Sequence, residues 1–219
     1  TNTNNNTNTN NNTTVYTGTS TNTNNNNKIA LVDSDDAHTY DSLNAPIALF
    51  AAGILEYRQD LQEERIAFLI PASLNYVTAL LGIWRAGGIA VPLNISSAEA
   101  ELEHYLGSIG VTRLIADAEC HGQLRKLCRQ LEIRLLAIDE VLAFESIDLP
   151  SLSPERSAMI LFTSGTTDKP KGVLTTHKAI RAQILTLLHA WKWSREDVIP
   201  LFLPLHHVHG IINVLCCAL

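Results

Sequence analysis

Short apolar runs alternate with amphipathic segments along the chain from residue 28 to its end. Apolar residues recur every three or four positions between Leu43 and Leu55, which predicts a helix with one buried face. Runs such as 65–70 and 89–93 are typical of strands that are covered on both faces. Further strands are expected at 112–116, 133–138, 159–162 and 172–176, and further helices at 75–86, 124–131 and 177–191.

This repeated order of strand and helix predicts an α/β fold. Because two parallel strands need a crossover between them, we expect a largely parallel sheet with helices on both faces. Local patterns add three details. They predict a hairpin of 28–33 with 37–40, a helix capped by Ser96 and Glu99 that runs to Gly107, and another buried strand at 198–203.

Residues 1–27 consist almost entirely of threonine and asparagine. Such a segment has too little apolar surface to offset the entropy of ordering, so we expect a disordered tail at 1–27 and one domain at 28–219. The tail lacks the apolar core of a signal peptide and the arginines of a transit peptide. Its first residue is Thr1 rather than methionine, so we expect the chain to have been cut or incompletely predicted at its start.

Composition narrows the possible functions. The 219 residues are 46% hydrophobic and carry a net charge of -6, which allows a substantial core and argues against a nucleic-acid surface. No run of 18 apolar residues occurs, so no membrane span is expected. The four cysteines have no metal-site spacing, and we interpret Cys216 and Cys217 as small, reduced core residues. We expect a cytoplasmic protein, with the mitochondrial matrix as an alternative.

The chemistry of the side chains changes directly after the apolar run at 159–162. The next five residues bring four hydroxyls and a flexible backbone together: Thr163, Ser164, Gly165, Thr166 and Thr167. In such loops, backbone N–H groups and hydroxyls converge on an anion. Lys169 and Lys171 add positive charge, and Pro170 stiffens the exit from the loop. The pattern predicts a phosphate-binding loop, and we expect Mg²⁺ to complete it because so few cations cannot neutralise a polyphosphate.

Another interpretation of this loop stays open. It is not a P-loop of the usual kind, because four residues after Gly165 the chain reads Pro170-Lys171-Gly172. A surface loop rich in serine, threonine, glycine and lysine between two strands would have the same composition.

The stretch TSGTTDKPKG at 163–172 resembles the signature of the adenylate-forming superfamily, which contains acyl-CoA synthetases, luciferases and the adenylation domains of peptide synthetases. Thr39-Tyr40-x-x-Leu43 and the stretch WRAGGIAVPLN at 84–94 resemble the first two core motifs of the same superfamily, in the same order. The resemblance covers about 28–219 and implies an incomplete N-terminal domain of the adenylate-forming fold. Taken alone, the two upstream motifs also fit simple packing of a helix that ends on glycines.

In this superfamily, the loop binds the β and γ phosphates of ATP while a carboxylate attacks the α phosphorus. The resemblance assigns ATP contacts to Thr163, Ser164, Gly165, Thr166, Thr167, Lys169, Lys171 and Gly172. Lys171 is the expected catalytic residue because its cation would stabilise the departing pyrophosphate, and Thr167 is the expected contact of Mg²⁺. Asp168 stands where the superfamily has glycine, so we expect its carboxylate to face solvent or to pair with Lys169.

Three histidines follow in the stretch PLHHVHG at 204–210. His207 and His209 share a face of an extended chain and could begin a metal site. The imidazoles could instead form structural hydrogen bonds with loop carbonyls, or line a pocket in which their protonated forms attract a carboxylate. The stretch resembles the fourth motif of the superfamily, which lines the acyl site, and this favours His207 and His209 as substrate-binding residues.

The stretch LPLHHVHG, together with Thr176-His177 and Trp191-Lys192-Trp193, is most similar to the malonyl-CoA synthetase branch. It implies an acid–thiol ligase that uses ATP, CoA and a small carboxylic acid, malonate or a similar one, and of which this chain is the N-terminal part. Two alternatives remain. An amino-acid adenylation domain would place an aspartate in this motif, which this chain lacks, and a truncated non-catalytic paralogue would act as a binding module.

Overall fold

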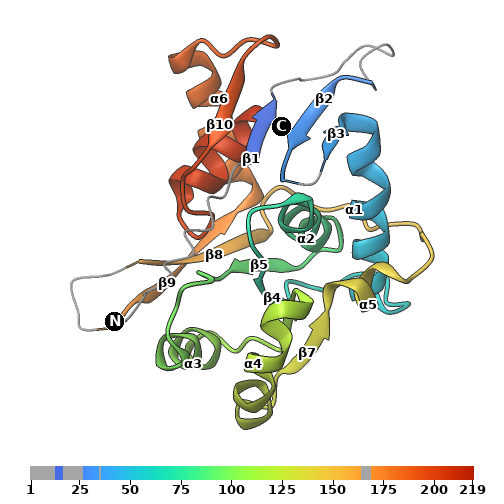
Figure 1. Ribbon diagram of the computed structural model, residues 1–219, viewed down its shortest axis with the longest axis vertical. Helices are drawn as coiled ribbons and strands as arrows, with labels where there is room; N and C mark the ends of the chain where they lie inside the picture. Colours follow the sequence, from blue (N-terminus) through green and yellow to red (C-terminus); the bar gives the residue numbers. More distant parts are fainter. Residues whose placement is uncertain (1–12, 17–26, 35, 164–168) are drawn as a thin grey trace, which may run out of the picture.

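The computed structural model describes residues 13–16, 27–34, 36–163 and 169–219. Within these residues, the larger sheet has six strands in the order β7-β6-β4-β5-β8-β9 (Figure 1). The strands are β4 (Arg65–Leu69), β5 (Ile89–Pro92), β6 (Arg113–Ala116), β7 (Arg134–Ala137), β8 (Ser157–Thr163) and β9 (Lys171–Thr176). Neighbouring strands are parallel except for β8 and β9. The predicted largely parallel sheet is confirmed.

Helices cover both faces of this sheet. One core includes residues from α1 (Tyr40–Leu55), α2 (Leu74–Arg85), α5 (Ile138–Leu142) and α6 (His177–Trp191). The other includes residues from α3 (Glu99–Ser108) and α4 (Ala118–Gln130). Along β4, Ile66 and Phe68 enter the first core while Ala67 and Leu69 enter the second, because successive side chains of a strand point to opposite faces. Figure 1 shows α2 above the sheet and α3 and α4 below it.

A second sheet was not expected from the sequence. Within the described residues it is antiparallel and consists of β10 (Val198–Leu201), β1 (Thr13–Tyr16), β2 (Ile29–Val32) and β3 (Ala37–Thr39), in that order. β2 and β3 form the predicted hairpin. β1 belongs to the segment expected to be a disordered tail, and it differs from that expectation because its backbone finds ladder partners in both β2 and β10. Residues 1–12 and 17–26 lie outside the described part, and the domain boundary at residue 27 stays a prediction.

The buried strand expected at 198–203 is wrong in its length and in its burial. β10 ends at Leu201, which is 2% exposed, whereas Val198 is 54% exposed and Phe202, beyond the strand, is 78% exposed. Ile199 packs against the core, so side chains alternate between core and solvent. An apolar run can therefore belong to a strand of a sheet that is covered on one face only.

The helix cap expected at Ser96 and Glu99 is also wrong. α3 begins at Glu99, and the carboxylate of Glu101 accepts a hydrogen bond from the N–H of Ala98 at 3.1 Å. Ser96 donates its own N–H to the side chain of Asn94 at 3.0 Å and so belongs to the loop after β5. The sequence pattern placed the cap two residues too early, at Ser96 instead of Ala98.

The cysteines behave as core residues. Burial raises the pKa of the Cys128 and Cys217 thiols to about 11, so both remain protonated and unreactive near neutral pH. The four cysteines are free thiols, as the sequence predicted. Among the described residues, no helix combines the length and the apolar character needed to cross a membrane.

A buried ion pair fixes the amino-terminal edge of the larger sheet. Arg113 is 4% exposed, and its Nε and Nη2 donate to the two carboxylate oxygens of Glu64 at 2.8 Å each. Burial alone would raise the pKa of Glu64, but the hydrogen bonds from Arg113 and Thr112 outweigh burial and hold this pKa below its ordinary value. The pair joins the start of β6 to the segment that precedes β4, at the end of the sheet opposite the cavities described below.

His177 makes the stability of the fold depend on pH. Its ring packs edge-on against Trp84 with centroids 5.7 Å apart, and burial, followed by the charge of Arg156, lowers its pKa below the ordinary value of 6.5, although Glu63 opposes this. The unfolded chain therefore binds a proton near pH 6.5 that the folded chain does not yet bind, and stability falls as pH falls below 6.5.

We expect the free energy of unfolding, measured by urea titration, to be lower at pH 5.5 than at pH 7.5. His177→Phe keeps the aromatic contact but removes the proton site, so its loss between the two pH values should be smaller. A part of the loss should persist in this variant, because His206 also has a lowered pKa. Equal losses in the wild type and His177→Phe would contradict the assignment to His177.

Candidate functional site

The predicted phosphate loop connects the two strands of the β8–β9 hairpin. Thr163 at the end of β8 is the ladder partner of Lys171 at the start of β9, so the hairpin brings these two predicted ATP contacts to the same end of the sheet. Thr163, Lys169 and Lys171 are exposed there. Ser164, Gly165, Thr166, Thr167 and Asp168 lie outside the described residues, and their assignments stay predictions.

Gly172 has a packing role next to this loop. A Cβ atom at this position would lie 2.9 Å from Cγ2 of Ile160 and 3.1 Å from Cγ2 of Ile109. Gly172 is also the ladder partner of Phe162. The glycine thus lets the segment after α3 approach the base of the hairpin closely, which is a sufficient structural reason for the residue type.

Two cavities meet at the carboxyl end of the parallel strands. The smaller encloses about 260 Å³ and is lined by both ends of the hairpin loop, Thr163 and Pro170, and by His206 and His207. The larger encloses about 440 Å³ and lies between the loops after β4, β5 and β10. Leu93, Asn94 and His206 line both cavities, so the two are adjacent.

The position of the cavities follows from the topology of the sheet. After β5 the chain returns to the other side of β4, so the strand order reverses between β4 and β5. The helices that follow these two strands, α2 and α3, lie on opposite faces, and the loops leading into them diverge. Open α/β sheets bind their ligands in the crevice that such a reversal leaves at the carboxyl ends of the strands. Pro71, after β4, and Asn94, after β5, line the larger cavity.

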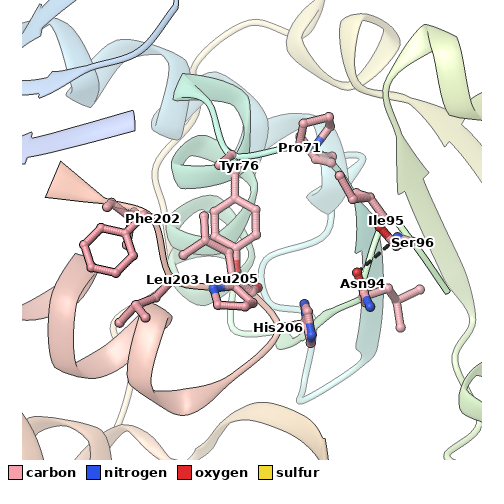
Figure 2. Close-up of a pocket in the computed structure, with 14 residues that line it drawn as sticks. Pro71, Tyr76, Asn94, Ile95, Ser96, Phe202, Leu203, Leu205 and His206 are labelled. Carbon is pink, nitrogen blue, oxygen red and sulfur yellow. Dashed lines mark hydrogen bonds between the residues drawn. The ribbon is translucent and has the colours of Figure 1, made fainter. Parts of the chain in front are cut away.

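A hydrogen bond from α2 holds the histidine-containing loop against these cavities. The hydroxyl of Tyr76 donates to the carbonyl of Leu205 at 2.6 Å, and Tyr76 is only 1% exposed. Figure 2 shows the ring of Tyr76 pointing toward Leu205, with His206 between Leu205 and Asn94. Burial raises the pKa of Tyr76 well above its usual range, so the hydroxyl remains a donor at neutral pH.

The structure separates the three histidines. His207 lines the smaller cavity, and its role in binding the substrate stays a prediction. His206, which the sequence analysis did not assign to the site, lines both cavities. His209 begins the π-helix η1 (His209–Cys216) and is not part of either lining. The expected protonated imidazole does not apply to His206, because burial and then the charge of His207 lower its pKa, which leaves it neutral near pH 7.

Two further cavity residues come from α3. Glu101 and Tyr105 line the smaller cavity beside Thr163 and Pro170. Burial and then the charge of Glu101 raise the pKa of Tyr105, so its hydroxyl remains protonated. Sequence reasoning missed both residues, because the pattern of a helix does not reveal which loop packs against its polar face. Asn94 could have been found, because it ends the second core motif directly after a strand.

The first two core motifs mainly hold the fold together. Thr39 caps α1 by accepting the N–H of Ser42 at 3.1 Å, and the hydroxyl of Tyr40 donates to the carbonyl of Ala218. In the second motif, Gly87 has a positive φ of 81°, and a Cβ atom there would lie 2.3 Å from Oδ1 of Asp60. Glycine is therefore needed for the turn itself. Of these two motifs, only the end of the second, from Pro92 to Asn94, reaches the cavities.

The described residues contain no group of three or more histidine, cysteine, aspartate or glutamate side chains that could hold a metal ion. The metal interpretation of His207 and His209 therefore gains no further ligand within that part of the chain. Thr167, the predicted contact of Mg²⁺, lies outside it.

Comparison with known proteins gives the family context of this site. The AMP-binding enzyme family matches residues 19–219. The mitochondrial malonate–CoA ligase ACSF3 of Mus musculus is 37% identical over 203 residues, which cover 88% of this chain and 35% of that protein. The malonate–CoA ligase of Arabidopsis thaliana is 34% identical over 167 residues, which cover 71% of this chain and 28% of that protein.

Among solved structures, apo MatB from Rhodopseudomonas palustris matches with a TM-score of 0.73 and 20% sequence identity, over 83% of this chain and 38% of that one. At this level of identity the likeness shows the fold alone. The chain spans about a third of the length of the curated relatives that it matches.

Proposed function

Because this chain belongs to the AMP-binding enzyme family, we propose that the protein is an ATP-dependent carboxylate–CoA ligase that prefers malonate or a similar small diacid. The family match confirms the resemblance to adenylate-forming enzymes noted in the three core motifs. In the proposed reaction, a carboxylate oxygen attacks the α phosphorus of ATP and pyrophosphate leaves. The thiol of CoA then attacks the acyl carbon of the adenylate, and AMP leaves.

The observation that carries this proposal is the meeting of the β8–β9 hairpin with the histidine-containing loop. Thr163 and Pro170, at the two ends of the predicted phosphate loop, line the same cavity as His206 and His207. An adenylating enzyme needs this adjacency, because the acid must lie next to the phosphate chain that it attacks. Lys171 would supply a positive charge for the departing pyrophosphate, and Thr163, Lys169 and Gly172 would complete the described part of the ATP contacts.

The cavity walls favour a small polar acid. His206, His207 and Asn94 present polar groups beside the hairpin, and Tyr105 adds a hydroxyl, whereas the carboxylate of Glu101 accepts the N–H of Ala98. We assign His207 to the acid. His209 remains a proposed substrate-binding residue, although it begins η1 and lines neither cavity. The names of the two malonate–CoA ligases are what support malonate over other small acids.

Mg²⁺ belongs to the proposal for a chemical reason. This ion takes oxygen ligands and keeps several waters, and a threonine hydroxyl with phosphate oxygens provides such a set. Thr167 remains the proposed protein ligand. The compartment proposed is the cytoplasm, with the mitochondrial matrix as the alternative that the name of the mouse relative supports.

The proposal is tested by supplying the full-length protein with MgATP, CoA and one acid at a time, and by measuring acyl-CoA with mass spectrometry. We expect malonate to give malonyl-CoA at least tenfold faster than acetate, because polar walls reject a substrate that leaves their groups unpaired. Phenylalanine should give no product. Activation of an amino acid in place of malonate, or the absence of any acyl-CoA, would overturn the proposal.

A further inference from the structure

One face of α3 is turned towards the base of the β8–β9 hairpin. Glu101, His104 and Tyr105 lie three and four positions apart and thus share a side of the helix. Glu101 and Tyr105 line the smaller cavity together with Thr163 and Pro170. His104 is half-buried, with its ring centroid 6.0 Å from that of Tyr105.

His104 contacts the segment that leads out of the predicted phosphate loop. Its Nε2 lies 2.9 Å from the carbonyl oxygen of Pro170. A carbonyl can only accept, so Nε2 carries the proton and donates it, which fixes the tautomer of the ring. Pro170 has no N–H group, so this carbonyl is its only backbone hydrogen-bonding group.

The contact matters because the carbonyl of Pro170 lies at the base of the hairpin. The last ladder pair of the hairpin is Thr163 with Lys171, so the carbonyl of Pro170 lies just beyond the end of the ladder. His104 thus donates to the carbonyl of the residue directly before β9. Because Pro170 also restricts the backbone of the residue before it, a fixed carbonyl here limits the directions that Lys169 and Lys171 can take.

The other strand of the hairpin is held from the same helix. Tyr105 stacks on Phe162 with centroids 4.3 Å apart and an interplanar angle of 29°. Phe162 directly precedes Thr163 and is the ladder partner of Gly172. α3 therefore contacts β8 through an aromatic ring and the residue directly before β9 through a hydrogen bond, from consecutive residues of one helix.

We propose that His104 is a positioning residue, which sets ATP affinity by holding the carbonyl of Pro170 and thereby the geometry of the hairpin base. This proposal rests on the proposed function for its ATP part. A positioning role and a purely structural role of His104 have different consequences. Loss of the hydrogen bond should weaken ATP binding and loosen the hairpin locally, with little effect on the acid or on overall stability.

The test compares His104→Leu, which keeps the volume but removes the donor, with His104→Gln, which keeps a donor amide. The matched control is His189→Leu, because His189 is an exposed histidine on α6. Each variant of the full-length protein is examined by hydrogen exchange of the peptide that covers 171–176. The Michaelis constants for ATP and malonate are measured in pyrophosphate exchange.

In His104→Leu we expect about fivefold faster exchange in 171–176 and about a fivefold higher KM for ATP, as for the loss of one ordinary hydrogen bond. The KM for malonate should change less than twofold. His104→Gln should recover most of both effects, and His189→Leu should match the wild type.

The proposal would be overturned if His104→Leu showed the wild-type rate of hydrogen exchange in 171–176 or an unchanged KM for ATP. Equal effects of the Leu and Gln variants would also overturn it. If the wild type catalysed no pyrophosphate exchange with any acid, the proposed function would fail separately. The hydrogen-exchange comparison, combined with calorimetric titration of ATP in the same variants, would then still decide the role of His104.

Discussion

Replacing Lys171 by alanine should lower kcat/KM for malonate-dependent pyrophosphate exchange by about 100- to 1000-fold, the loss typical of one group that stabilises charge in a transition state. Lys171 is exposed at the start of β9, opposite Thr163, beside the cavity that His206 and His207 line. Negative charge develops on pyrophosphate as it leaves, and a fixed cation lowers the energy of that state more than that of bound ATP. The fold should remain intact, because exposed substitutions change stability by only about 0.5 kcal/mol.

The matched control is Lys178→Ala. Lys178 is an exposed lysine at the start of α6 whose Nζ contacts Glu155 at 2.7 Å, away from the cavities. We expect this variant to keep wild-type kinetics within about twofold, because exposed ion pairs contribute little. Unchanged pyrophosphate exchange in Lys171→Ala would remove Lys171 from the catalytic role. An equal loss in both lysine variants would point to a general effect of charge.

The largest effect on stability is expected from Gly53→Ala in α1. A Cβ atom at this position would lie 1.9 Å from the carbonyl oxygen of Val141 in α5, which is a backbone atom and cannot turn away. α1 and α5 would have to separate, and overpacking of this kind costs about 3 kcal/mol. In a domain of this size, such a loss lowers Tm by roughly 6 to 12 °C. The change is measured by thermal and urea unfolding of the 219-residue chain.

Gly122→Ala is the same substitution in another helix, and we expect it to raise stability instead of lowering it. Gly122 lies inside α4, and a Cβ atom there would meet no atom within 4 Å. Alanine is the better helix former, so this variant should gain about 0.5 to 1 kcal/mol. If both variants changed stability in the same direction, or if Gly53→Ala were as stable as the wild type, the close packing of α1 on α5 would be refuted.

The sequence predicted the larger sheet well because its parallel strands from β4 to β7 are short apolar runs that alternate with helices. In β4, four residues from Ile66 to Leu69 are buried on both faces, which leaves the run uniformly apolar. The second sheet escaped prediction for two reasons. β10 has the same apolar composition although its outer side is exposed, and β1 has the composition of a segment with no core to join.

The candidate site was predicted in part. The hairpin and His207 could be located from motifs, because a strand that runs into a hydroxyl-rich loop has a recognisable pattern. His104 and Tyr105 could not be located in this way, because their role depends on contacts with residues far along the chain. His104 contacts Pro170, which lies 66 residues later, and Tyr105 contacts Phe162. His206 lines both cavities, and its neighbour His207 lines the smaller one, whereas the extended chain that would place His207 and His209 on one face turns into the π-helix at His209.

The central claim is that this protein activates a carboxylate by adenylation. It is tested most directly by incubating the full-length protein with malonate and MgATP in the absence of CoA, and by identifying the products with mass spectrometry and phosphorus NMR. The account predicts malonyl-adenylate and pyrophosphate in equal amounts, and neither when malonate is omitted. Formation of ADP and phosphate, or ATP that remains unchanged in the presence of malonate, would contradict it.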